Sequence, residues 1–151
     1  MSRPVLANAD PDGFKAVVAL EKHLRSVVDR DIFELVWLRA SIINGCAFCV
    51  DMHSRDALRN GESVDRLLAL TAWPESPLFT ESERAALALT DAVTRIENGG
   101  VDDAVWAAAA QAFGDAATVQ LVLAIAAINV WNRVAISTHM QSTPGRERPS
   151  T

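Results

Sequence analysis

The chain has 151 residues, a formal net charge of −5 and a sequence pI near 5.1, and half of its residues are hydrophobic. This length predicts a single domain, over residues 1–140, whose core is large enough to fold without structural disulfides. The acidic balance and the scattered basic residues argue against a nucleic-acid partner. Residues 141–151 are expected to form a disordered tail.

The N-terminal and apolar segments predict a cytoplasmic protein with no membrane partner. Met1–Pro4 are soon followed by polar residues, not by the uninterrupted apolar stretch of a signal peptide. The longest apolar run, Leu121–Ile128, is shorter than the roughly 18 residues that a membrane-spanning helix needs. In a reducing compartment, neighbouring cysteines serve catalysis or metal binding more often than structure.

The first 60 residues predict three helices. Asp10-Pro11 supplies an N-cap and a first-turn proline, and apolar residues then recur at helical spacing as far as Val28. Asp31 is expected to cap a second helix, which ends at Asn44-Gly45. The third helix opens with a Cys-x-x-Cys sequence and runs to Asn60-Gly61.

The rest of the chain predicts four more helices and no strand. Their expected limits are Ser63 to the proline-containing loop 73–77, Thr80 (in a capping box with Glu83) to Asn98, Asp102 to Gly114, and Ala117 to Thr138. The last helix is nearly all apolar in its first half and should be buried on most sides. The expected fold class is therefore an all-α helical bundle.

The strongest functional signal is Glu34, followed after eleven residues by Cys46-Ala-Phe-Cys49 and after three more by His53. At about 100° per residue, the two cysteines and the histidine share a sector of roughly 60° on one helix face. Backbone N–H groups in a first helical turn favour thiolates, whereas His53, one turn after Cys49, can accept a thiol proton. The helix start and the histidine thus favour different cysteines, and the spacing leaves open which one attacks.

Glu34 is expected to reach the same place from the preceding helix. It lies ten residues before Asn44, about 15 Å along its helix, and His53 lies about 12 Å along the next one. If the chain reverses at Gly45, the carboxylate can orient or charge-balance the imidazole. In the last helix, Asn132 and Arg133 either line the pocket or tie helices together.

This pattern resembles the alkylhydroperoxidase D-like, or carboxymuconolactone decarboxylase-like, family, whose redox members share its Glu, Cys-x-x-Cys and His spacing. Residues 46–57 and 128–133 are also similar to the family, and the resemblance covers about residues 14–140. It implies an alkylhydroperoxidase D-like bundle and a thiol-dependent peroxidase of the alkyl hydroperoxide reductase type.

In the cycle that the resemblance implies, Cys49 attacks the peroxide and becomes a sulfenic acid, and Cys46 resolves it as a disulfide. His53 receives the Cys49 proton and Glu34 completes the relay. Many members have a second histidine between the cysteines, where this chain has Phe48.

The implied partners are a hydroperoxide substrate, a dithiol reductant or reductase protein, and further copies of the chain in a trimer or hexamer. No cofactor is expected, and no metal, because three ligands on one helix (Cys46, Cys49 and His53) cannot readily surround a tetrahedral ion. Two alternatives stay open. One is a lactone decarboxylase-like enzyme of the same superfamily, whose members generally lack the Cys-x-x-Cys, and the other is a non-catalytic redox-sensing or metal-binding module.

Overall fold

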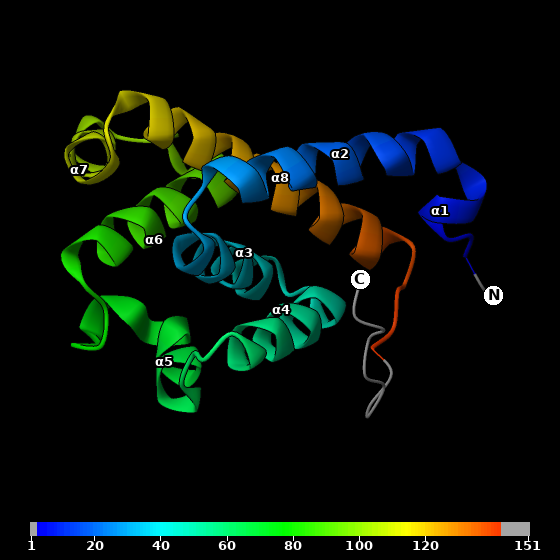
Figure 1. Ribbon diagram of the computed structural model, residues 1–151, viewed down its shortest axis with the longest axis horizontal. Helices are drawn as coiled ribbons and strands as arrows, with labels where there is room; N and C mark the ends of the chain where they lie inside the picture. Colours follow the sequence, from blue (N-terminus) through cyan, green and yellow to red (C-terminus); the bar gives the residue numbers. More distant parts are fainter. Residues whose placement is uncertain (1–2, 143–151) are drawn as a thin grey trace.

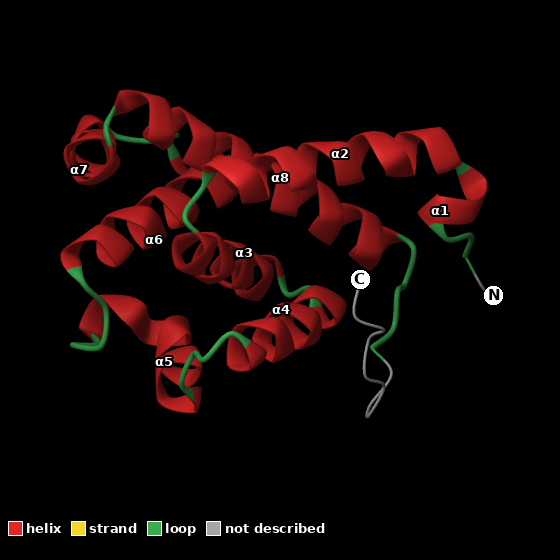
Figure 2. Ribbon diagram, viewed as in Figure 1, coloured by secondary structure: helices red, strands yellow, loops and turns green. Residues whose placement is uncertain are grey.

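The computed structural model describes residues 3–142, which form eight α-helices and two short 3₁₀ turns with no strand among them (Figures 1 and 2). The elements are α1 (Leu6–Ala9), α2 (Pro11–Val27), α3 (Arg30–Asn44), α4 (Ala47–Arg59), α5 (Val64–Ala69), η1 (Leu70–Glu75), α6 (Glu81–Thr94), η2 (Ile96–Asn98), α7 (Asp103–Phe113) and α8 (Asp115–Ser137). The predicted all-α fold is confirmed.

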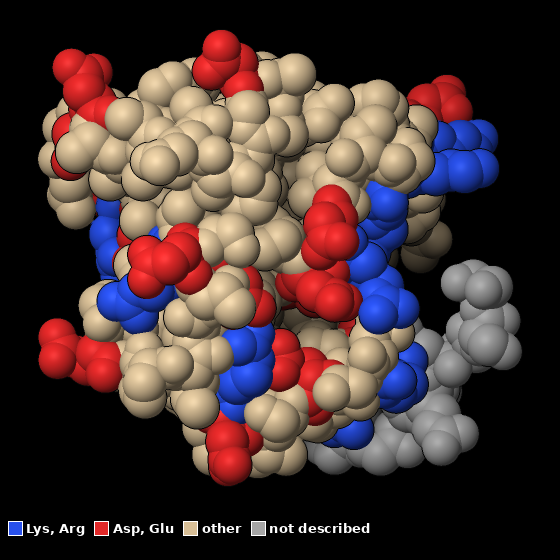
Figure 3. Space-filling view, turned by 60° about the vertical axis from the view of Figure 1, so that its left-hand side comes forward, with Lys and Arg blue, Asp and Glu red and all other residues tan. Residues whose placement is uncertain are grey.

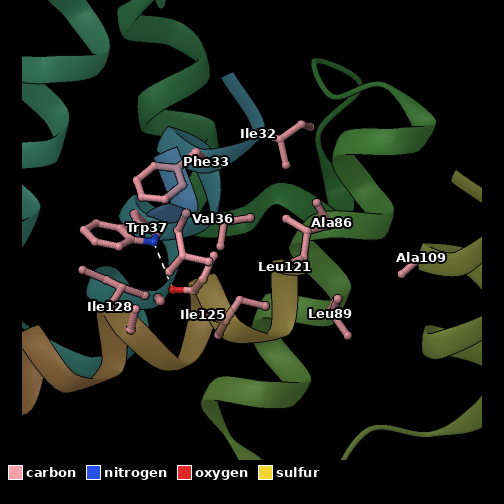
Figure 4. Close-up of a cluster of buried hydrophobic side chains, with 14 residues drawn as sticks. Ile32, Phe33, Val36, Trp37, Ala86, Leu89, Ala109, Leu121, Ile125 and Ile128 are labelled. Carbon is pink, nitrogen blue, oxygen red and sulfur yellow. Dashed lines mark hydrogen bonds between the residues drawn. The ribbon is translucent and has the colours of Figure 1, made fainter. Parts of the chain in front are cut away.

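Helix α3 lies at the centre of the bundle, in contact with α4, α6 and α8 (Figure 1). Every residue from Ile32 to Ser41 is buried, including the polar and charged ones. Trp37 fixes α3 against α8, because its Nε1 donates a hydrogen bond to the carbonyl of Ala124 at 3.0 Å (Figure 4). The helix that carries Glu34 is therefore held on three sides.

Side-chain caps place most helix ends where the sequence predicts them. Asp10, Ser63 and Asp102 each accept a backbone N–H at a helix start, and Thr80 forms a complete capping box with Glu83. These caps fix the lengths of the helices that surround the site.

Two predicted helix limits are wrong. Asp29, not Asp31, caps α3, because its carboxylate accepts the N–H groups of both Asp31 and Ile32. Helix α6 ends at Thr94 and not at Asn98, since a 3₁₀ turn follows and closes on Gly99. Residues 73–75 of the expected loop also form part of a 3₁₀ turn.

Helix α8 is less buried than its composition predicts. Val119, Leu123 and Val130 lie on one face and are 57, 42 and 41% exposed. In Figure 3, the upper part of the view, where Figure 1 places α2, α7 and α8, shows mainly uncharged side chains. An apolar surface of this kind is typical of a face that meets another protein.

By length and composition alone, α8 is long and apolar enough to cross a membrane. A single helix of this kind is weak evidence for a membrane span, because core helices of soluble proteins can have the same composition. In the structure α8 packs against α2, α3, α4, α6 and α7. Of its most apolar stretch of 18 residues, 39% is buried. Its opposite face therefore belongs to the core of the bundle. The expected tail, residues 141–151, lies mostly outside the described residues.

Candidate functional site

The site begins at the tight connection between α3 and α4. Gly45 adopts a left-handed conformation (φ 67°), which suits glycine and ends α3 in a Schellman motif. The N–H of Cys46 completes that motif by donating to the carbonyl of Ser41 at 3.0 Å. Cys46 is also the N-cap of α4, so two helices fix the position of a single residue.

The two cysteine sulfurs lie together at the start of α4. Their Sγ atoms are 2.8 Å apart, both side chains are free thiols, and each residue is only 1% exposed. Disulfide formation needs a separation of about 2.05 Å, so the sulfurs can join with little backbone movement. The sequence prediction that the pair can close a disulfide is therefore sterically sound.

The surroundings of the two sulfurs differ. Cys46 Sγ accepts the backbone N–H of Cys49 at 3.4 Å, an interaction that strengthens when the sulfur is negative. Burial, and to a smaller extent the neighbouring Cys46, raise the pKa of Cys49 from its usual 9.0 to about 12. Asn132 acts in the opposite direction on the pKa of Cys49 but does not cancel it. Burial and the neighbouring Cys46 thus disfavour the thiolate form of Cys49.

Glu34 and His53 meet beside the cysteines, as their spacing predicts. The Oε2 atom of Glu34 lies 3.7 Å from Nδ1 of His53, and the two residues are 7 and 1% exposed. The rings of His53 and Trp37 are perpendicular, with centroids 5.3 Å apart, and this packing orients the imidazole. Within the described residues neither ring nitrogen has a hydrogen-bond partner, so His53 forms no hydrogen bond to Cys49 in this structure.

Arg25 is a member of the site that sequence reasoning missed. Its Nη1 donates to Oε1 of Glu34 at 2.8 Å, and its guanidinium lies over the rings of Phe33 and Trp37. Burial by itself raises the pKa of Glu34, but the facing His53 and the charge of Arg25 outweigh it and hold that pKa below its usual value. Glu34 is therefore a buried anion with a cation on one side and an imidazole on the other.

Buried amides connect the ends of α3 and α8 behind the cysteines. Asn44 donates to the side-chain oxygens of both Asn129 and Asn132, at 3.0 and 2.8 Å, and Asn132 donates to Ser41 at 3.0 Å. Arg133 donates to the side chain of Asn129 at 2.7 Å. Asn132 thus ties α8 to α3 and also faces Cys49, whereas the contact of Arg133 lies within α8.

Two cavities reach this arrangement from different sides. One of about 180 Å³ is lined by Cys46 and by residues at the end of α8, among them Ile136, His139 and Met140. His139 shapes this wall, because it takes the left-handed conformation (φ 57°) of a second Schellman motif and turns Met140 toward the sulfurs. The other cavity, of about 210 Å³, reaches Glu34 between α3, α5 and α6.

The described residues contain no cluster of three or more Cys, His, Asp or Glu side chains arranged to hold a metal ion. The chemistry that the geometry supports is that of a thiol pair beside a buried carboxylate and imidazole. The fold and the site together define a helical protein with a Cys-x-x-Cys pair at a helix start.

Comparison with known proteins identifies the family. Residues 11–92 match the Carboxymuconolactone decarboxylase family, and the chain belongs to it. It is 38% identical, over 84% of its length and 87% of the relative's, to the uncharacterized protein YdfG of Bacillus subtilis (strain 168).

Solved structures share the fold. The crystal structure of ATU0492 from Agrobacterium tumefaciens, a protein of unknown function, has a TM-score of 0.91 and 42% identity, covering 95% of this chain and 99% of that one. The debrominase Bmp8 in its apo form has a TM-score of 0.80 at 22% identity, over 91% of this chain and 74% of Bmp8. At that identity the likeness to Bmp8 concerns the fold alone.

Proposed function

We propose that this protein is a thiol-dependent peroxidase that cycles between a Cys46–Cys49 dithiol and a disulfide. The observation that carries the proposal is the 2.8 Å contact between two buried sulfurs beside the Glu34–His53 pair. The likeness to ATU0492, which is described as a candidate antioxidant defence protein AhpD, supports it. The lactone decarboxylase-like alternative gives these thiols no role.

The cycle has three balanced steps. A cysteine thiolate attacks the terminal oxygen of a hydroperoxide, the O–O bond breaks, and the departing alkoxide takes a proton to leave as an alcohol. The second thiol attacks the resulting sulfenic acid, which forms the disulfide and releases water. An external dithiol then reduces the disulfide and is itself oxidised to a disulfide.

Cys46 is our assignment for the first thiolate. It accepts the helix N–H and lines the cavity of about 180 Å³, whereas Cys49 has a raised pKa and does not line that cavity. This assignment reverses the order that the family resemblance implies.

His53 and Glu34 supply the proton transfer in this proposal. His53 takes the proton of the thiol pair, and the anionic Glu34 stabilises the imidazolium that forms. Both side chains are buried, so their charges interact in a medium of low polarity. In such a medium a carboxylate attracts an imidazolium more strongly than it does at the surface. The gap of 3.7 Å must shorten during the reaction for a direct hydrogen bond to form.

Trapping the sulfenic acid tests the cycle and the assignment together. Cys49→Ser should accumulate a sulfenic acid on Cys46 after one equivalent of an organic hydroperoxide, as detected by a dimedone adduct in mass spectrometry. A sulfenic acid that forms only on Cys49, in the Cys46→Ser variant, would return the roles to the order of the resemblance. No peroxide consumption by the wild type with a dithiol reductant would refute the proposed function.

The partners and the compartment follow from the same cycle. A hydroperoxide and a dithiol reductant or reductase protein are the required partners, and a reducing compartment such as the cytoplasm would keep the pair free for catalysis. The exposed apolar face of α8 supports assembly with further copies of the chain, as a trimer or hexamer.

A further inference from the structure

Arg25 sits between two carboxylates that lead from the surface of the bundle to the site. Its Nε donates to Glu21 at 3.0 Å and its Nη1 donates to Glu34 at 2.8 Å. Glu21 in turn accepts a hydrogen bond from Nε1 of Trp131 on α8, at 3.1 Å. The guanidinium is thus held by two anions and lies 4.4 Å above the ring of Phe33.

The other charged groups near Glu34 already have partners of their own. Asp31, Glu62, Arg66 and Glu83 line the cavity of about 210 Å³ on its far side. Arg66 donates to Glu62 at 2.9 Å and to Glu83 at 2.6 Å, and Asp31 accepts from Arg30. Within residues 3–142, Arg25 is therefore the arginine that forms an ion pair with Glu34.

Each oxygen of Glu34 has a different role. Oε1 is held by Arg25, whereas Oε2 has no hydrogen-bond partner among the described residues and faces Nδ1 of His53. An ionised carboxylate can only accept, so it favours the imidazole tautomer with the proton on Nδ1 and a free lone pair on Nε2. A protonated Glu34 could instead donate to Nδ1 and would place the proton on Nε2.

We propose that Arg25 is a positioning residue that acts through Glu34, holding its carboxylate as an anion with Oε2 toward His53, so that Nε2 is free to accept a thiol proton. The inference rests on the proposed function and adds a residue to it. Burying a carboxylate without a partner favours its neutral form, and Arg25, paired with Glu34 at 2.8 Å, opposes this together with the facing His53.

The expected effect of losing Arg25 depends on pH, which a purely structural role would not. In Arg25→Met, burial still raises the pKa of Glu34 and His53 still lowers it, but the hydrogen bond and charge of Arg25 are gone, so the pKa rises. The loss of an adjacent opposite charge favours the neutral form of a carboxyl group. Activity should therefore fall at least about tenfold on the acid side of the profile and recover as the pH rises.

The test measures the tautomer of His53 directly, from ¹⁵N imidazole chemical shifts between about pH 5 and 9. The chain has only three histidines, which makes assignment practical. In Arg25→Met the change to the Nδ1–H tautomer should move to higher pH, and Arg25→Lys, which keeps the charge, should restore it. Arg55→Met removes a comparable arginine ion pair, with Asp51 on the surface of α4, and should behave as wild type.

Peroxide consumption over the same pH range completes the experiment. In a Glu34→Gln background, Arg25→Met should have no further effect, because its effect passes through Glu34. An unchanged His53 tautomer in Arg25→Met, or a loss of rate that is equal at every pH, would overturn the proposal. If the wild type consumes no peroxide, the proposed function fails, while the tautomer measurement still decides whether Arg25 acts on His53 through Glu34.

Discussion

Cys49 should be the slow thiol of the reduced protein, although its sulfur lies next to a reactive partner. A pKa raised from 9.0 to about 12 lowers the fraction of thiolate at neutral pH by about a thousandfold. Because the thiolate is the nucleophile, alkylation of Cys49 by iodoacetamide should be slower by a similar factor than for an ordinary thiol. Cys46, which accepts the N–H of Cys49 and lines a cavity, should react first.

Cys46→Ser separates the causes of this effect. The serine can still accept the N–H of Cys49, but the neighbouring sulfur is gone, so the part of the pKa rise that comes from Cys46 should disappear. Burial remains and is the largest cause, so the Cys49 pKa should fall but stay above 9.0. Alkylation of Cys49 should then be faster in the variant than in the wild type.

Fragmentation mass spectrometry of the alkylated protein locates the label, and the pH dependence of the rate separates ionisation from access. In wild type, the Cys49 rate should keep rising about tenfold per pH unit past pH 9, whereas a thiol that is merely inaccessible would level off near its ordinary pKa. The denatured chain, in which the two cysteines should react alike, is the control. Labelling of Cys49 before Cys46 in the folded wild type would refute the reasoning.

Three further outcomes are expected. Mild peroxide should lower the free thiols of the monomer from two to none, because Cys46 and Cys49 already touch, and covalent dimers on a non-reducing gel would contradict this. Glu34→Gln and His53→Gln should each slow peroxide reduction by about 10²- to 10⁴-fold, and a rate within about twofold of wild type would make the residue structural. Light scattering should give a mass of three or six chains because the apolar face of α8 needs a cover, and a mass near 16.3 kDa would refute the assembly.

Much of the fold could be predicted because its signals are local. Helix caps such as Asp10 and Thr80 act within three residues, and the αL glycine after Asn44 is a local stop signal. The N-cap of α3 was misplaced because Asp29 and Asp31 are both acceptable caps by residue type. Only the three-dimensional turn after α2 shows which carboxylate reaches the free N–H groups.

The sequence predicts the part of the site whose residues lie on two consecutive helices joined by one turn. Glu34 and His53 meet because α3 and α4 are joined by a single tight turn. The rise per residue is therefore enough to predict that both residues lie at a similar distance from this turn along their helices. Arg25 carries no comparable signal, since it approaches Glu34 from α2, whose crossing angle the sequence does not encode locally. The separate environments of the two sulfurs likewise depend on α8, which lies far along the chain.

At the N-cap of α4, the proposed redox chemistry and the stability of the helix depend on the same atom. Serine and aspartate oxygens are the usual acceptors at this position, and sulfur accepts N–H groups weakly, so Cys46 is a poor choice by the standard of helix formation alone. Replacing it by serine should therefore strengthen the start of α4 while removing a thiol from the pair. At the beginning of this helix, serine would favour thermal stability and cysteine favours the proposed redox reaction. The chain has cysteine at this position.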